Sequence, residues 1–200
     1  MRKKDIDLFF QELDRELGSR ADIILVGASA GALMGHIRPS VDIDFEIRLK
    51  SRKTRQAQAK LESAILRVSR RAGVAVNYSE DISRWSMVSY LNYRKTAVPY
   101  KRIGRLNIKL IAPEYWTIGK MTRFLELDIK DMIKIIKIKK LGPRKLVKLW
   151  SRALKASDLS LELGQFRSHV AYFISKYGHR LWGRHLNLKK LMDDFSRAAK

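Results

Sequence analysis

Residues 41–49, VDIDFEIRL, alternate strictly between apolar and charged side chains. Because successive side chains of a β-strand point to opposite faces, this alternation predicts a strand with one buried face and one charged face. The residues expected to face the core are Val41, Ile43, Phe45, Ile47 and Leu49. The opposite face would carry Asp42, Asp44, Glu46 and Arg48. A fold that contains this segment must therefore include a sheet with a covered face.

Helical and strand patterns alternate around this segment. Apolar residues at helical spacing over residues 6–17 predict an amphipathic helix that ends at Gly18. Further strands are expected over residues 22–26, 74–78, 86–92 and 105–111, the last two as a possible pair. Further helices are expected over residues 30–36, 52–72, 113–124, 128–141, 144–156, 158–176 and 188–199. The sequence thus predicts an α/β fold with a mixed sheet flanked by helices over residues 1–141. An all-helical, basic C-terminal region follows over residues 142–200.

The charge balance is the most unusual bulk property of the chain. Its 42 Lys and Arg residues against 20 Asp and Glu residues give a formal net charge of +22. Such a surface attracts polyanions, so RNA is the expected partner, and an acidic protein partner would explain the charge equally well. The absence of cysteine, of an apolar export signal after MRKK and of any membrane-length apolar run favours a cytoplasmic location.

Asp42 and Asp44 are the first candidates for a functional site. Two residues apart on a strand, their carboxylates leave the same face and can share one hard divalent cation such as Mg²⁺. The alternative is an edge strand whose exposed charges prevent pairing with another sheet.

The small-residue turn at residues 27–31, GASAG, admits two interpretations. It matches G-x-S-x-G, the strand-to-helix turn that exposes a nucleophilic serine, and GASAGAL is similar to the patatin-like lipases. Against a Ser29 hydrolase, residues 1–26 contain one glycine and no oxyanion loop, and no Asp precedes a Gly. The turn otherwise suits phosphate binding by backbone N–H groups at a helix N-terminus.

The order of these motifs resembles the nucleotidyltransferase superfamily with the polymerase β-like fold. The nearest branch is that of the abortive-infection and toxin–antitoxin nucleotidyltransferases. The resemblance rests on VGASAGALMG, then SVDIDF at residues 40–45, then KMTR at residues 120–123 and DIKD at residues 128–131. It implies transfer of a nucleoside monophosphate from an NTP to an acceptor with Mg²⁺ as cofactor. RNA is the favoured acceptor, with tRNA as the leading candidate, and a toxin or defence role is implied.

The resemblance also implies residue roles. Gly27 and Ser29 would hold the nucleotide phosphates, and Asp42 and Asp44 would bind Mg²⁺. Lys120 would neutralise triphosphate charge. Asp128 or Asp131 would orient Lys120 or help to deprotonate the attacking group. Read without the resemblance, Lys120 is a solvated charge, Asp128 an N-cap and Asp131 a partner of nearby lysines.

Two departures from the family pattern keep a non-catalytic alternative open. Ala28 replaces a second glycine of the turn, and the stretch compared with the third family carboxylate, residues 105–109, offers Asn107 and Lys109 instead. The alternative is a basic RNA-binding or partner-binding protein on the same fold. In it, the lysines of residues 129–141 and the interleaved aromatic residues of the C-terminal region would bind RNA. Those aromatic residues are Trp150, Tyr172, Tyr177 and Trp182; the four histidines, among them His36, lack metal-ligand spacing.

Overall fold

The computed structural model describes residues 1–35, 38–51 and 54–199 and divides them into two compact units. Unit 1 comprises Met1–Ile82 and Thr96–Ile111, and unit 2 comprises Ser83–Lys95 and Ala112–Lys200. The expected mixed α/β class is confirmed. The division differs from the expected one near Gly142, because the helices that follow Ile111 pack on one another as a separate helical unit.

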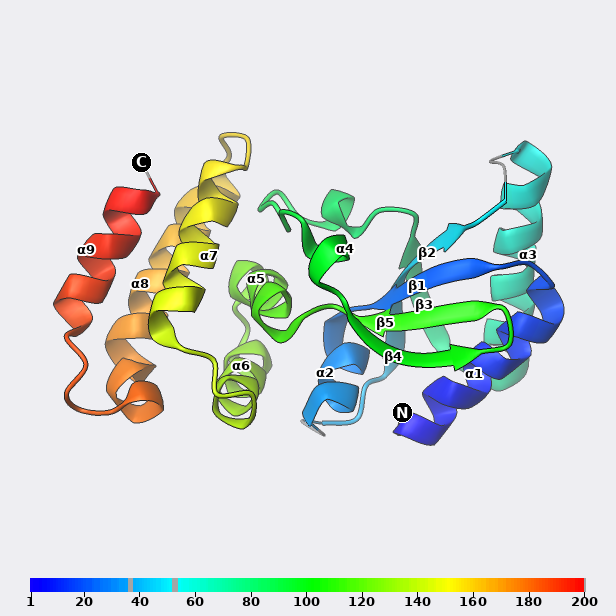
Figure 1. Cartoon of the computed structure of the whole chain (residues 1–200), viewed down its shortest axis with the longest axis horizontal. Helices are drawn as coiled ribbons and strands as arrows, with labels where there is room; N and C mark the ends of the chain where they lie inside the picture. Colours follow the sequence, from blue (N-terminus) through cyan, green and yellow to red (C-terminus); the bar gives the residue numbers. More distant parts are fainter. Residues whose placement is uncertain (36–37, 52–53, 200) are drawn as a thin grey trace. The chain divides into compact units, whose positions relative to one another are not determined.

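Unit 1 is built on a five-stranded mixed sheet of order β3-β2-β1-β5-β4 (Figure 1). β1 pairs antiparallel with β2 and parallel with β5, β2 pairs parallel with β3, and β4 pairs antiparallel with β5. The strands are β1 (Ala21–Leu25), β2 (Asp42–Leu49), β3 (Ala75–Ser79), β4 (Val98–Ile103) and β5 (Leu106–Leu110). The helices of this unit are α1 (Lys3–Leu17), α2 (Gly27–Gly35) and α3 (Arg55–Ala72).

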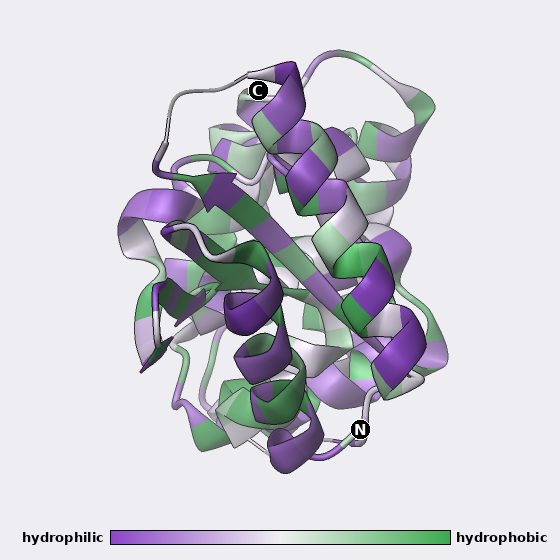
Figure 2. Cartoon of the chain, turned by 90° about the vertical axis from the view of Figure 1, so that its right-hand side faces the viewer, coloured by the Kyte–Doolittle hydropathy of each residue, from purple (hydrophilic) through white to green (hydrophobic). Residues whose placement is uncertain are grey.

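The core of unit 1 lies between the sheet and the packed pair α1 and α3. Phe9 and Phe10 of α1 contact Phe45 of β2, with ring centroids 6.1 and 5.5 Å apart. The apolar residues that predicted α1 are all buried, namely Ile6, Phe9, Phe10, Leu13 and Leu17. The predicted end of the helix at Gly18, with φ of 63°, is also confirmed. Figure 2 shows hydrophobic and hydrophilic residues alternating around the helices and along the strands. Burial of these aromatic side chains is the dominant stabilising contribution to this layer.

Three expectations about strands need correction. β2 begins at Asp42, and the side chain of Val41 is 84% exposed. Residues 86–92 form no strand; Ser86 and Ser89 accept hydrogen bonds from the N–H groups two residues ahead, which favours turns. The antiparallel partner of β5 is β4 and not residues 86–92. β4 is an exposed edge strand, and its Pro99 and polar residues give no strand pattern in the sequence.

Unit 2 is helical, with α7, α8 and α9 packed together and α5 packed on α6, α7 and α8. Trp150 of α7 is fully buried, its ring centroid lies 6.1 Å from that of Phe173, and its Nε1 donates to Thr117. The helices are α5 (Pro113–Arg123), α6 (Glu126–Ile138), α7 (Pro143–Lys155), α8 (Leu161–Trp182) and α9 (Leu188–Ala198). Two short segments, η1 (Ile82–Trp85) and α4 (Tyr93–Thr96), lie at the boundaries between the units. No helix of the described residues is both long and apolar enough to cross a membrane.

Candidate functional site

Asp42 and Asp44 lie at the start of β2, on the face of the strand opposite to buried Ile43 and Phe45. Both carboxylates are half-buried, and both accept hydrogen bonds from one atom, Nδ2 of Asn77. This nitrogen lies 3.0 Å from Oδ2 of Asp42 and 2.8 Å from Oδ1 of Asp44. The two carboxylates therefore converge on a single point, as the paired carboxylates of a cation site must.

Asn77 is the residue of this site that the sequence pattern did not reveal. β3 runs parallel to β2, and Asn77 is the register partner of Asp44. The available signal was the order strand, helix, strand over residues 42–79. Such a crossover places its two strands parallel in one sheet, and here they are neighbours.

The donor set of this cluster fits Mg²⁺. Within the described ranges, no three His, Asp or Glu side chains gather at one position. The protein ligands of a bound ion would therefore be the carboxylates of Asp42 and Asp44 and the amide of Asn77. The oxygen and nitrogen of an amide exchange places by a 180° rotation, which would turn a donor into a ligand oxygen. Mg²⁺ usually takes few protein carboxylates and completes its shell with water and substrate phosphates.

Gly27 connects the turn after β1 to Asp44. Its φ is +56°, a conformation that L side chains rarely adopt, and a Cβ built on it would lie 1.8 Å from Oδ2 of Asp44. The N–H of Val26 also donates to the carbonyl of Asp44 at 2.9 Å. Asp44 is consequently held beside the first residue of α2, where a helix N-terminus favours negative charge.

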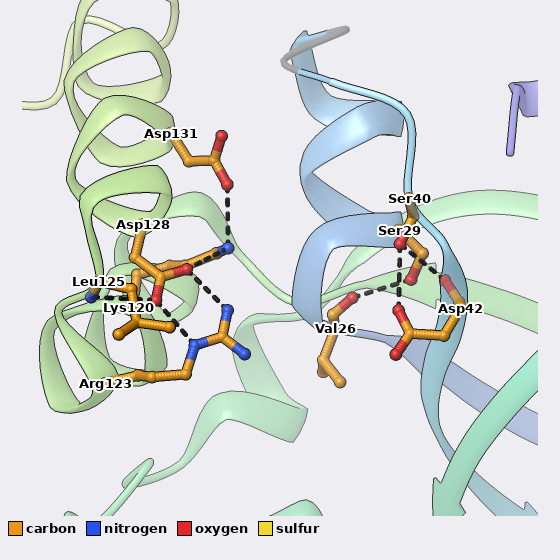
Figure 3. A network of polar contacts seen from close by, with 9 residues as sticks. All are labelled: Val26, Ser29, Ser40, Asp42, Lys120, Arg123, Leu125, Asp128 and Asp131. Carbon is orange, nitrogen blue, oxygen red and sulfur yellow. Dashed lines mark hydrogen bonds and ion pairs between the residues drawn. The ribbon is translucent and has the colours of Figure 1, made fainter.

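Ser29 lies inside the structure, with no exposed surface. Its hydroxyl donates to the carbonyl of Val26 at 3.0 Å (Figure 3). It also accepts a hydrogen bond from the N–H of Asp44 at 3.4 Å. In this position the side chain supports the turn and β2. A nucleophile must reach its substrate, so the burial of Ser29 disfavours the hydrolase interpretation.

Ser40 supports the other aspartate. Its side chain is buried, and its hydroxyl donates to the carbonyl of Asp42 at 2.7 Å and lies 3.3 Å from Oδ1 of the same residue. Ser40 is the first residue of the SVDIDF motif, and its position gives that serine a physical role in orienting Asp42. His36, a further candidate for phosphate contact, lies outside the described residues.

Residues 105–109, the stretch compared with the third family carboxylate, place Asn107 far from Asp42. Asn107 pairs in register with Asp22 and donates to its Oδ1 at 3.0 Å. Asp22 is opposite Arg48, six residues along β2 from Asp42, which corresponds to about 20 Å. Glu46 is buried and accepts a hydrogen bond from the N–H of Ile82 at 3.2 Å, so it is occupied in holding η1.

A second cluster, in unit 2, joins α5 to α6. Nζ of Lys120 donates to Oδ1 of Asp128 at 2.8 Å and to Oδ2 of Asp131 at 3.0 Å (Figure 3). Lys120 is 3% exposed, Asp128 1% and Asp131 3%. Lys120 is therefore not a solvated charge, and Asp131 pairs with Lys120 rather than only with surface lysines of its own helix.

Asp128 receives a second cation. Arg123 donates to both of its carboxylate oxygens at 2.7 Å, and the N–H of Leu125 lies 3.4 Å from Oδ2. Burial alone would raise the pKa of Asp128, but the hydrogen bonds from Arg123 and Lys120 outweigh it and lower the pKa below its ordinary value. Asp128 thus both caps α6 and remains ionised in a buried position.

The structure brings the predicted site residues together in two groups, each described within its own unit. Gly27, Asp42 and Asp44 form the first with Asn77, and Lys120, Asp128 and Asp131 form the second with Arg123. Comparisons of this chain with protein-family models, with curated proteins and with solved structures find no match.

Proposed function

We propose that this protein is a Mg²⁺-dependent nucleotidyltransferase that moves a nucleoside monophosphate from an NTP to an RNA acceptor such as tRNA. The observation that carries the proposal is the convergence of Asp42 and Asp44 on one point, at Nδ2 of Asn77. Support comes from the turn at Gly27, where the backbone conformation and the Asp44 carboxylate together require glycine. The resemblance of the motif order to the nucleotidyltransferase superfamily supplies the reaction class.

In the proposed reaction an acceptor oxygen bonds to the α-phosphorus of the NTP, and the bond to pyrophosphate breaks. Bound Mg²⁺ would supply positive charge against the phosphate oxygens. Asp42 and Asp44 would hold the ion, and backbone N–H groups of the turn at Gly27 would bind phosphate. Such catalysis consists mainly of positioning and charge stabilisation.

The resemblance implies that Lys120 neutralises triphosphate charge and that Asp128 and Asp131 orient it; because Lys120 is 3% exposed, this role requires the triphosphate to reach a buried Nζ. Both carboxylates accept hydrogen bonds from its Nζ. Asp128 is unsuited to deprotonate the acceptor, because Arg123 and Lys120 hold its pKa below the ordinary value. Asp131 is 3% exposed and paired with Lys120, so the proton of the acceptor would leave to solvent.

The direct test incubates purified protein with Mg²⁺, each α-³²P-labelled NTP in turn, and total cellular RNA plus protein lysate. The Asp42→Ala/Asp44→Ala variant runs alongside, and Asp193→Ala/Asp194→Ala on α9 is a matched control that also removes two carboxylates. We expect label in RNA with wild type and with the control, and none with the Asp42/Asp44 variant or with EDTA.

The alternative functions give different outcomes. Absence of label with every NTP, together with equal RNA binding by wild type and the Asp42/Asp44 variant, would refute the catalytic proposal and favour the RNA-binding protein. Growth arrest on induced expression, abolished in the Asp42/Asp44 variant, is the result expected for a toxin-like role.

A further inference from the structure

We propose that the groove between α6 and α8 binds single-stranded RNA. The groove has a volume of about 520 Å³ and lies wholly within unit 2. The groove is lined by four charged and two apolar residues of α6 and by two residues of α8: Glu126, Lys130, Lys134, Lys137, Ile129, Ile133, Tyr177 and Arg180. The choice of RNA as the polyanion rests on the proposed function, whereas the location of the surface does not.

The groove forms where the buried face of α6 departs in part from the apolar pattern of residues 129–141, although Met132 and Ile136 of that pattern are buried as it predicts. Asp128 and Asp131 face inward to bind Lys120, and Ile135 is buried with them. Ile129 and Ile133 belong to the same apolar pattern but are only half-buried and lie in the groove. The buried ion cluster therefore turns apolar surface of α6 outward between its lysines.

The cations of the groove are arranged to meet a linear polyanion. Lys130, Lys134 and Lys137 follow one another along successive turns of α6, about 5.4 Å apart. Lys130 pairs with Glu126 at 2.6 Å in an exposed ion pair that contributes little. For Lys137 and Arg180, no carboxylate partner occurs in the part of the chain that the structure describes, which leaves their charge for a ligand.

Aromatic rings continue from the groove along α8. The ring of Tyr177 lies 6.4 Å from that of Tyr172, and Tyr172 lies 6.0 Å from Phe124. Phe124 in turn stacks on His169 at 4.4 Å with an interplanar angle of 12°. Nζ of Lys176 lies 5.1 Å from the Tyr172 ring centroid and 6.0 Å from that of Tyr177.

This combination favours single-stranded nucleic acid over other polyanions. Rings with adjacent cations provide stacking for unpaired bases and charge for phosphates. An acidic peptide would use the cations but not the rings. A membrane surface would need a broad apolar face, whereas Ile129 and Ile133 are recessed between charged side chains.

The test measures RNA binding without nucleotide or Mg²⁺, by fluorescence anisotropy of a labelled unstructured RNA of about 12 nucleotides. Its main variant is Lys134→Gln/Lys137→Gln/Arg180→Gln. The matched control, Lys4→Gln/Lys60→Gln/Arg70→Gln, removes the same three charges from exposed positions of unit 1. Tyr177→Ala, with Tyr177→Phe as its control, tests stacking. Circular dichroism and Tm verify that each variant folds.

We expect the groove variant to bind at least tenfold more weakly and to lower the slope of log Kd against log salt by about 2. The unit 1 control should change Kd by less than about threefold with its slope retained. Tyr177→Ala should weaken binding by about fivefold or more without altering the slope, whereas Tyr177→Phe should bind as wild type does.

Equal losses in the groove variant and the unit 1 control would overturn the proposal, because binding would then be spread over the basic surface. Parallel titrations use DNA of the same sequence, polyglutamate and phosphatidylserine-containing vesicles. If polyglutamate or vesicles bind in a groove-dependent way and nucleic acid does not, the groove binds another ligand and the RNA proposal is overturned. The Asp42→Ala/Asp44→Ala variant should bind RNA as wild type does. Label transfer therefore tests the proposed function, and RNA binding by the groove variant independently tests the groove.

Discussion

Gly27 leaves open the space that the carboxylate of Asp44 fills. A Cβ at Gly27 would lie 1.8 Å from Oδ2 and 2.9 Å from Cβ of Asp44. This close approach joins the turn after β1 to the start of strand β2 and links two separate motifs of the sequence. It explains in steric terms why the turn begins with glycine even though Ala28 follows it.

Gly27→Ala should move Asp44 and weaken metal binding. We expect a loss of about 2 kcal/mol or more in the free energy of unfolding, from backbone strain plus the contact with Asp44. Any rise in Tm on Mg²⁺ addition should be lost as well. Gly18→Ala is the matched control, since Gly18 has φ of 63° and nothing within 4 Å of a built Cβ. The control should show only the strain, about 1 kcal/mol, and an unchanged Mg²⁺ response.

Asn77→Asp should convert the amide position into a third carboxylate. Without metal the added charge repels Asp42 and Asp44, so Tm in EDTA should fall. With Mg²⁺ present, the Tm of Asn77→Asp should instead exceed that of wild type. Its Mg²⁺ Kd from thermal-shift titration should drop by about tenfold, or about 1.4 kcal/mol. Asn107→Asp places the same charge beside Asp22 at the far end of the sheet, and it should lower Tm without improving the Mg²⁺ response. An unchanged Mg²⁺ Kd in Asn77→Asp would argue against a metal at this point.

Lys120→Met should be strongly destabilising, because it leaves two carboxylates buried with one cation lost. The expected cost is about 3–5 kcal/mol in urea-induced unfolding. Arg197→Met, which breaks an exposed pair with Asp194, should cost less than about 1 kcal/mol. In Lys120→Met/Asp131→Leu, stability should largely return while label transfer stays absent if Lys120 contacts the triphosphate. Recovery of both stability and label transfer in this double variant would show that Lys120 stabilises the fold and does not contact the triphosphate.

The pKa of Asp128 predicts a specific loss of stability in acid. Burial opposes ionisation, yet Arg123 and Lys120 hold the folded pKa below the unfolded value of about 3.9. The stabilisation is therefore complete above the unfolded pKa and is lost as the pH falls through the folded pKa. Wild type should exceed Asp128→Asn in free energy of unfolding at about pH 6, and the difference should shrink below about pH 4. A difference that stays constant over this range would contradict the ionised, cation-bound state of Asp128.

Ser29→Ala tests the hydrolase interpretation. We expect a loss of about 1 kcal/mol, from the hydrogen bond to Val26, and label transfer within a few-fold of wild type. Wild type should not react with a fluorophosphonate probe, because the hydroxyl is buried. Specific labelling of Ser29 in wild type, absent in Ser29→Ala, would support the interpretation of Ser29 as a nucleophile.

Elements with a strong period were predictable from the sequence. The apolar spacing of α1, its end at Gly18 and the alternation of β2 each report a local rule of backbone geometry. Edge strands follow no such rule, since neither face of β4 carries a continuous apolar pattern. Residues 86–92 were wrongly predicted as a strand, because the hydroxyls of Ser86 and Ser89 accept local backbone hydrogen bonds that favour turns.

The sequence by itself determined that Asp42 and Asp44 share a face, because strand periodicity is local. It also determined that a small-residue turn precedes them and that the chain carries a charge of +22. Only the tertiary structure decided that Asn77 bridges the two carboxylates, since strand pairing and register join residues 35 positions apart. It likewise decided that Lys120 is buried between Asp128 and Asp131 and that α6 turns its lysines and isoleucines toward α8. The physical reason is that charge burial depends on which partners packing brings within hydrogen-bond distance, and no local period of the chain encodes that.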